Sequence, residues 1–190
     1  MSARREELTR AAARLFAERG YQGTSLADLA DALGMQKPSL YHHIESKEDL
    51  LWDVASEGAA AFHAALDGVP GELPAIERIR LALAAHLGVV AAQLDVATVF
   101  VREWRFLSGE RQEQFVAERR RYEQRIRGLF REGVEGSELR TDLDVATAAL
   151  LFLSAANWAY TWLRPGANIA ELADRMFAVL LDGMRGYATP

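Results

Sequence analysis

Apolar residues recur every three or four positions along most of the chain, the spacing that places side chains on one face of an α-helix. The pattern predicts one helix at residues 3–19 and two short helices between residues 24 and 47. Longer helices are expected at residues 47–66, 75–94, 96–107, 110–134, 143–163 and 169–186. No stretch alternates apolar and polar residues as a half-buried strand does. The sequence therefore predicts an all-α fold of about nine helices.

The two short helices are separated by a tight turn. Apolar residues at i, i+3, i+4 and i+7 line one face of the first, and Thr24 and Ser25 supply its N-cap oxygen. Gly34 ends it, because a residue without a Cβ most easily adopts the left-handed backbone of that position. Pro38 fits the first turn of the second short helix. Two short helices joined by such a turn form a helix-turn-helix, and DNA is the expected partner.

The second short helix has few apolar anchors, so most of its surface is free for a partner. A helix fits the major groove, where Gln, Lys, Ser and His side chains reach base edges and Tyr reaches a phosphate. The predicted DNA-contacting residues are Thr24, Ser25, Gln36, Lys37, Pro38, Ser39, Tyr41, His42, His43 and Lys47.

Ser46 is the expected N-cap of the helix at residues 47–66, with Asp49 completing a variant of the capping box. Lys47 then lies in the first turn, where the helix dipole disfavours a cation. A phosphate bound at this helix end accounts for a lysine there. The alternative is a solvated surface lysine.

Residues 4–51 resemble the N-terminal domain of TetR-family repressors. The residues that carry the resemblance are Phe16 to Tyr21, Thr24–Ser25, Leu29–Ala30, Gly34, Leu40 to His43 and Ser46 to Glu48. Two positions depart from the family pattern: Ile44 stands where Phe is usual, and Pro38 where Gly is frequent. The resemblance implies a helix-turn-helix DNA-binding domain at residues 1–47. It implies an effector-binding and dimerisation domain at residues 48–190, with the 47–66 helix connecting the two.

The same resemblance implies individual roles. The positions that match those gripping the DNA backbone in the family are Thr24, Tyr41 and Lys47. The better candidates for base contacts are Gln36, Lys37, Ser39 and His42. The resemblance further implies that an effector shifts the 47–66 helix and so changes the spacing of the two recognition helices in a dimer.

Polar residues interrupt the apolar faces of the later helices. A buried polar group needs a partner, and a lone buried charge is costly. These groups either pair with each other, as Glu103 with Arg119, or line a cavity and meet a ligand; aromatic residues on three helices favour a pocket. The predicted effector-binding residues are His86, Phe100, Glu103, Trp104, Arg119, Tyr122, Asn157, Trp158 and Trp162.

Three segments, Arg102 to Leu107, Arg119 to Tyr122 and Asn157–Trp158, also resemble the TetR branch that responds to acyl-CoA thioesters. That branch includes repressors of fatty-acid and steroid catabolism. The resemblance implies an acyl-CoA effector. The arginines of residues 119–127 are then candidates for the CoA phosphates, and the alternative is a solvated helix face.

Composition narrows the choice of function. The chain is 50% apolar and 26% charged, as in ordinary globular proteins, and has no cysteine, which excludes disulfides and thiol chemistry. Residues 1–47 carry seven Lys/Arg and six Asp/Glu, so the net charge of −5 arises from the rest of the chain. Few phosphates are then neutralised by one subunit, and DNA affinity is expected to require two copies.

No nucleophile elbow, phosphate loop or paired metal-ligand motif is present in the sequence, so an enzyme is not expected, nor any cofactor or metal. No secretory signal is found, so a cytoplasmic protein is expected. Residues 145–163 carry no formal charge and are long enough to cross a bilayer. Their alanines and polar residues favour a buried or interface helix over a membrane span.

The wide apolar faces of the helices at residues 143–163 and 169–186 predict half of a four-helix dimer interface. The alternative is packing within one subunit. The sequence thus predicts a homodimeric repressor that a small effector, an acyl-CoA by resemblance, releases from a palindromic double-stranded DNA operator. An activator, or a regulator whose N-terminal domain binds a protein partner, remains the alternative.

Overall fold

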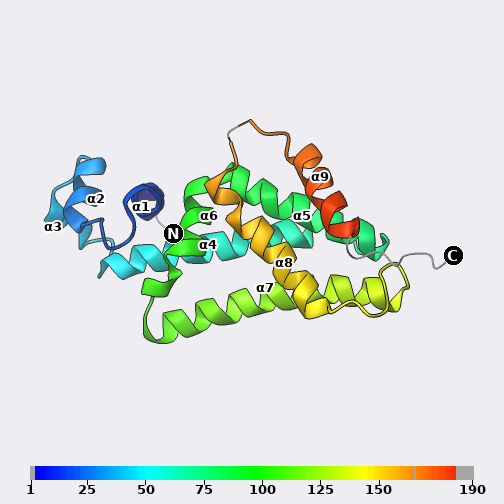
Figure 1. Ribbon diagram of the computed structural model, residues 1–190. Helices are drawn as coiled ribbons and strands as arrows, with labels where there is room; N and C mark the ends of the chain where they lie inside the picture. The colour runs from blue at the N-terminus through cyan, green and yellow to red at the C-terminus, as the bar shows by residue number, and fades with distance from the viewer. Residues whose placement is uncertain (1–2, 165, 183–190) are drawn as a thin grey trace. The chain divides into compact units, whose positions relative to one another are not determined.

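The computed structural model describes residues 3–164 and 166–182, and within these ranges it is all-α, as predicted (Figure 1). The α-helices are α1 (Ala3–Arg19), α2 (Leu26–Ala32), α3 (Lys37–Leu40), α4 (Lys47–Asp67), α5 (Ala75–Ala92), α6 (Leu94–Arg102), α7 (Gly109–Glu135), α8 (Val145–Asn157) and α9 (Ile169–Asp182). Two 3₁₀ helices follow α6 and α8, namely η1 (Trp104–Phe106) and η2 (Trp158–Thr161).

Three predicted helices differ from the observed ones. The expected helix at 96–107 ends at Arg102, and η1 continues the chain with a tighter winding. The expected helix at 143–163 becomes α8 and η2. The second short helix covers four residues, and Tyr41 to His43 lie in a turn after it. Residues 183–186 of the last predicted helix lie outside the described residues.

The chain divides into two compact units. Unit 1 contains the described residues up to Ala60 together with Gln93–Glu118, and unit 2 contains Ala61–Ala92 together with the described residues from Arg119 onward. Helices α4 and α7 therefore contribute residues to both units. These units are defined by contacts, so the functional boundary between residues 47 and 48 stays a prediction.

Unit 1 is built on α1, which contacts both α2 and α6. The fully buried side chains of α1 include Leu8 and Phe16, and the Phe16 ring meets the Tyr21 ring edge-on at 5.2 Å. Helices α4 and α6 approach closely at Gly58, where a Cβ would lie 3.0 Å from the Cβ of Phe100. A side chain at position 58 would therefore require the neighbouring Phe100 to move by a few tenths of an ångström.

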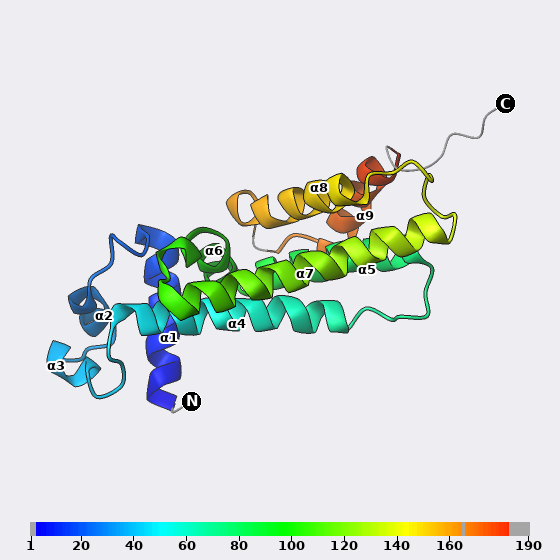
Figure 2. The same cartoon turned by 90° about the horizontal axis from the view of Figure 1, so that it is seen from below.

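Unit 2 is organised around α5, which contacts α8, η2 and α9, as Figure 2 shows for the two longer helices. Phe62, Phe130 and Phe152 fill its interior. The Glu138 carboxylate accepts hydrogen bonds from the amides of Ala75 and Ile76, each at 2.9 Å, and so caps the start of α5.

No single described helix is both long and apolar enough to span a membrane. The consecutive helices α5 and α6 meet the length and composition criteria only when they are taken together.

Candidate DNA-binding and effector-binding sites

A capping box begins α2. The Ser25 hydroxyl accepts the Asp28 amide at 3.1 Å, and the Asp28 carboxylate accepts the Ser25 amide at 2.7 Å. Hydrogen bonds from Ser25 hold the pKa of Asp28 below its ordinary value. Gly34 follows α2 with a φ of +61°, which confirms its predicted left-handed conformation. Both ends of α2 are thus set by local sequence.

Helix α3 and the turn after it have only two buried side chains. Leu40 and Ile44, the predicted anchors, are 0% and 3% exposed. The amides of His43 and Ile44 both donate to the Leu40 carbonyl, which tightens the chain into a turn after α3. The predicted recognition residues with exposed side chains are Gln36, Lys37, Pro38, Tyr41 and His42, and Ser39 and His43 are half-buried. This stretch presents a polar, largely exposed surface.

Thr24 is a buried residue of unit 1. Its side chain is 1% exposed, and its hydroxyl donates to the carbonyls of Leu15 at 3.2 Å and Gly20 at 3.0 Å. A hydroxyl that donates to two backbone carbonyls holds the loop between α1 and α2 in place. The contact with the DNA backbone that the resemblance implies for Thr24 stays a prediction.

Lys47 also has partners within unit 1. Its ammonium donates to the carbonyls of Tyr21 at 2.7 Å and Thr24 at 2.8 Å, and lies 4.1 Å from the Tyr21 ring centroid. Burial lowers its pKa. The predicted capping box beside it is confirmed, since Asp49 donates its amide to Ser46 and accepts the Ser46 amide at 2.9 Å. Lys47 is thus a half-buried group, not the solvated lysine of the alternative.

Glu103 is held against the α1–α2 loop. It is 5% exposed, and its Oε2 accepts the Tyr21 amide at 2.9 Å. The Tyr21 ring stacks on Phe106 of η1 at 5.5 Å. Glu103 was expected among the effector-binding residues, but the structure gives its carboxylate a partner inside unit 1. Phe100 and Trp104 also belong to unit 1, where both rings contact Phe115.

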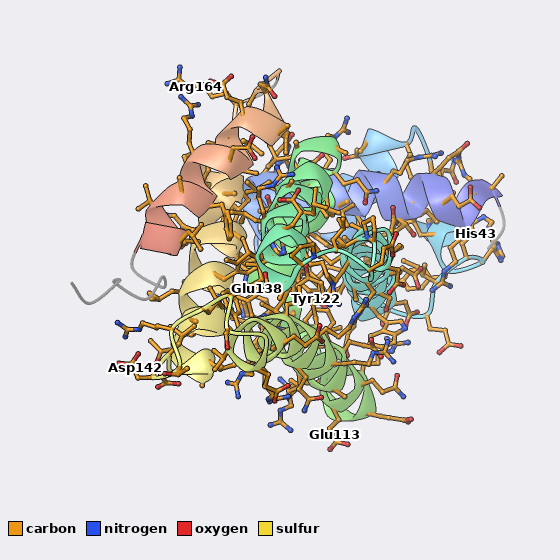
Figure 3. All side chains as sticks on the ribbon, turned by 90° about the vertical axis from the view of Figure 1, so that its right-hand side faces the viewer. His43, Glu113, Tyr122, Glu138, Asp142 and Arg164 are labelled. Carbon is orange, nitrogen blue, oxygen red and sulfur yellow. The ribbon has the colours of Figure 1, made fainter. Side chains whose placement is uncertain are left out.

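Two predicted effector-binding residues meet in unit 2. The Nδ1 of His86 lies 3.1 Å from the Tyr122 hydroxyl, and the His86 ring lies 4.5 Å from the Phe62 ring. Figure 3 shows Tyr122 in the interior, whereas Asp142 and Arg164 lie at the periphery. Burial lowers the pKa of His86 to about 3 and raises the pKa of Tyr122. The pair is therefore neutral at pH 7.

The remaining predicted effector residues of unit 2 differ in burial. Burial lowers the pKa of Arg119, which lies one turn before Tyr122 on α7. Asn157 ends α8 half-buried, and Trp158 and Trp162 are 61% and 41% exposed. The two tryptophans belong to an outer face of unit 2.

An open cleft of about 350 Å³ lies near the ends of α4 and α7 in unit 2. Arg78 and Arg125 line it together with the acidic residues Asp67 and Glu132. Arg125 pairs with Asp67 at 2.6 Å, and Arg78 pairs with Glu132. The cleft is thus electrically balanced, and the predicted availability of Arg125 for a CoA phosphate requires that its pair with Asp67 opens.

Comparison with known families decides the identity of the fold. Residues 8–54 match the description "Bacterial regulatory proteins, tetR family", and residues 72–184 match "Tetracyclin repressor-like, C-terminal domain". The chain belongs to the TetR family. The members it matches are transcriptional regulators and not enzymes.

Individual TetR-family relatives align over nearly the whole chain. The transcriptional repressor KstR2 of Rhodococcus jostii is 28% identical over 187 residues, 96% of this chain and 92% of the relative. The structure of the regulator PfmR from Thermus thermophilus has a TM-score of 0.84 and 32% identity, covering 92% of this chain and 97% of that one. The structure of AibR in complex with isovaleryl coenzyme A and operator DNA has a TM-score of 0.85 and 28% identity, covering 94% and 98%.

Sequence analysis did not identify Tyr21 as a residue that holds the helix-turn-helix of this TetR-family chain in place. Tyr21 stands immediately after the glycine that ends α1, which is a turn position with no periodicity to interpret. A signal was available in Glu103, an acidic residue on an otherwise apolar face. The partner of such a residue is set by tertiary structure, here across 82 positions.

Proposed function

We propose that this TetR-family regulator is a homodimeric repressor that binds a palindromic operator and is released from it by an acyl-CoA thioester. The observation that carries the proposal is the exposed polar surface of α3 and its following turn, held in place by buried contacts of Leu40, Ile44 and Lys47. Such a surface can enter the major groove, where Gln, Lys, Ser and His reach base edges.

The charge of unit 1 favours a dimer. Within the recognition segment from Gln36 to Lys47 the cations are the two lysines, so one subunit neutralises few phosphates. A twofold dimer doubles the contacts and presents two recognition segments to two half-sites. A roughly palindromic operator follows from that symmetry.

An apolar outer face of unit 2 supplies the dimer contact in this proposal. Leu150 and Leu151 of α8 are 62% and 53% exposed, Trp158 of η2 is 61% exposed, and Val179 of α9 is 77% exposed. Large apolar side chains that are exposed in one chain are typical of an interface. Burying Trp158 and Val179 against their symmetry mates removes the apolar surface from water.

The effector half of the proposal rests on the buried His86–Tyr122 pair and on AibR, whose solved complex contains isovaleryl coenzyme A and operator DNA. Ligand sites are mostly apolar with a few convergent polar groups, and Phe62, His86 and Tyr122 match that description. Effector binding in unit 2 shifts α4, which contributes residues to both units, and so moves the helix-turn-helix. A hundredfold loss of operator affinity requires a coupling free energy of about 2.7 kcal/mol.

The test is a fluorescence anisotropy titration onto DNA from upstream of the protein's own gene, at several salt concentrations, with and without hexadecanoyl-CoA. Tight binding that weakens steeply with salt and is abolished by the thioester is expected. Binding that the thioester leaves unchanged would retain the DNA-binding regulator and reject the acyl-CoA effector. The absence of binding at every salt concentration would point to an operator elsewhere in the genome or to a non-DNA partner for the helix-turn-helix.

A further inference from the structure

The His86 side chain contains a buried nitrogen that the protein leaves unpaired. His86 is 1% exposed, and its Nε2 has no hydrogen-bond partner among the residues that the structure describes. An unpaired buried polar group loses its hydration without compensation. Native proteins retain few such groups, so the Nε2 calls for a physical explanation.

The neighbouring phenol determines which hydrogen-bonding role Nε2 has. A neutral imidazole has one donor and one acceptor nitrogen. The Tyr122 hydroxyl lies 3.1 Å from Nδ1, and a phenol is a good donor to an imidazole lone pair. When Tyr122 donates to Nδ1, the ring proton lies on Nε2. Burial keeps the ring neutral by lowering the His86 pKa to about 3, so in this tautomer Nε2 is an uncharged N–H donor at pH 7.

The aromatic neighbour does not satisfy this donor. The planes of the Phe62 and His86 rings are inclined by 31°, with centroids 4.5 Å apart. An N–H bond lies in the plane of its own ring, so Nε2–H runs roughly along the Phe62 face and not into it. The acceptor for this donor is therefore a group outside the described protein atoms, and a bound ligand can supply it.

We infer that the Nε2–H of His86 donates a hydrogen bond to the thioester carbonyl oxygen of the effector. The inference rests on the proposed acyl-CoA function and specifies the ligand group to which His86 donates a hydrogen bond. The site requires an uncharged acceptor, because Phe62 and Tyr122 enclose a neutral imidazole that cannot balance a buried carboxylate. A free fatty acid is accordingly a poor ligand, although its chain matches that of the thioester.

The experiment compares two ligands that differ in the carbonyl alone. Hexadecanoyl-CoA carries the thioester, and S-hexadecyl-CoA is the thioether with a CH₂ in its place; both have the same charge and chain length. Calorimetric titration of the wild type should give about tenfold tighter binding of the thioester, the expected effect of one buried hydrogen bond. The variant His86→Phe keeps an aromatic ring on Phe62 and should bind both ligands equally.

Two controls separate recognition from folding. His86→Phe should retain the helical circular dichroism spectrum of the wild type, which reports that the variant folds. Tyr122→Phe removes the hydroxyl that fixes the tautomer of His86, and should lose part of the preference for the thioester. A purely structural role of His86 would change affinity for both ligands alike.

Each other outcome overturns the inference in an identifiable way. Equal binding of both ligands to the wild type would leave an acyl-CoA effector but remove His86 as the reader of its carbonyl. A tenfold preference retained in His86→Phe would place the carbonyl elsewhere. Hexadecanoate binding as tightly as the thioester would reject the neutral-acceptor requirement. If neither CoA ligand binds, the proposed effector class fails together with the inference.

Discussion

The Oε2 of Glu103 accepts a hydrogen bond from the backbone amide of Tyr21 at 2.9 Å, although 82 positions separate the two residues. Glu103 follows α6, and Tyr21 lies in the loop that leads into α2. The same tyrosine stacks on Phe106 and lies beneath the Lys47 ammonium. Tyr21 thus joins the α6–η1 segment, the start of α4 and the loop that leads into the helix-turn-helix.

Removal of the Glu103 carboxylate should destabilise unit 1. A hydrogen bond to a charged group contributes about 2 kcal/mol, so Glu103→Ala should lower the free energy of unfolding by that order. Glu103→Gln keeps the shape with a weaker acceptor and should lose about half as much. Urea unfolding measures both. Glu113→Ala, at an exposed position of α7, is the matched control and should be neutral; an equally neutral Glu103→Ala would refute the role of this contact.

Lys47→Met should affect both stability and DNA binding. Methionine keeps an apolar stem but loses the bonds to the Tyr21 and Thr24 carbonyls and the contact with the Tyr21 ring, a loss of about 1–2 kcal/mol. Two of the three protons of the Lys47 ammonium are donated to these carbonyls, and the third can be donated to a phosphate. The slope of log affinity against log salt should therefore fall by about 1 per subunit.

Lys37→Met separates these two effects, because Lys37 is exposed on α3. It should reduce the salt slope by about the same amount while leaving urea unfolding unchanged. An unchanged salt slope in Lys47→Met, with lowered stability, would assign Lys47 to structure alone.

Local sequence was sufficient to predict much of the fold. Periodicity located the helices, and cap residues located several ends, as at Gly34 and at the Ser46–Asp49 pair. These features depend on residues within one or two turns of each other, so the amino-acid sequence alone is enough to predict them. The helix-turn-helix, which is built from such features, was predictable for the same reason.

Tertiary contacts determine the structural features that the sequence did not predict. Periodicity continued the helix through Glu103 to residue 107, but the chain tightens into η1 after Arg102, where Glu103 reaches Tyr21. The carbonyls of Leu15 and Gly20 accept hydrogen bonds from the Thr24 hydroxyl, which the sequence did not indicate. In the candidate effector site, sequence singled out His86 and Tyr122 separately, and only the packing of α5 on α7 pairs them.

Stability should fall as the solution is made mildly acidic, because His86 is buried in its neutral form. The unfolded chain binds a proton near pH 6.5, whereas the folded chain resists protonation down to about pH 3. The unfolded state therefore holds more protons between these values, and stability present above pH 6.5 is lost as pH falls. The slope approaches about 1.4 kcal/mol per pH unit for one proton.

Urea unfolding of the wild type and His86→Phe from pH 7 to about pH 4.5 measures this contribution as a difference between the two proteins. Carboxylates with lowered pKa values, such as Asp28, lose their contribution at lower pH and in both proteins, so they cancel. Parallel stability curves of the two proteins would contradict a neutral buried His86.

Charge placed on the outer face of α8 and α9 should separate the subunits. Leu150→Asp with Val179→Asp puts two carboxylates where the proposed dimer buries apolar surface, and an unpaired buried charge costs several kcal/mol. The monomer should still fold, because both positions are exposed within one chain. Light scattering should therefore report a folded monomer that binds operator DNA at least a hundredfold more weakly. Ala91→Asp, at an exposed alanine of α5, is the control and should stay dimeric; a double variant that also stays dimeric would locate the interface elsewhere.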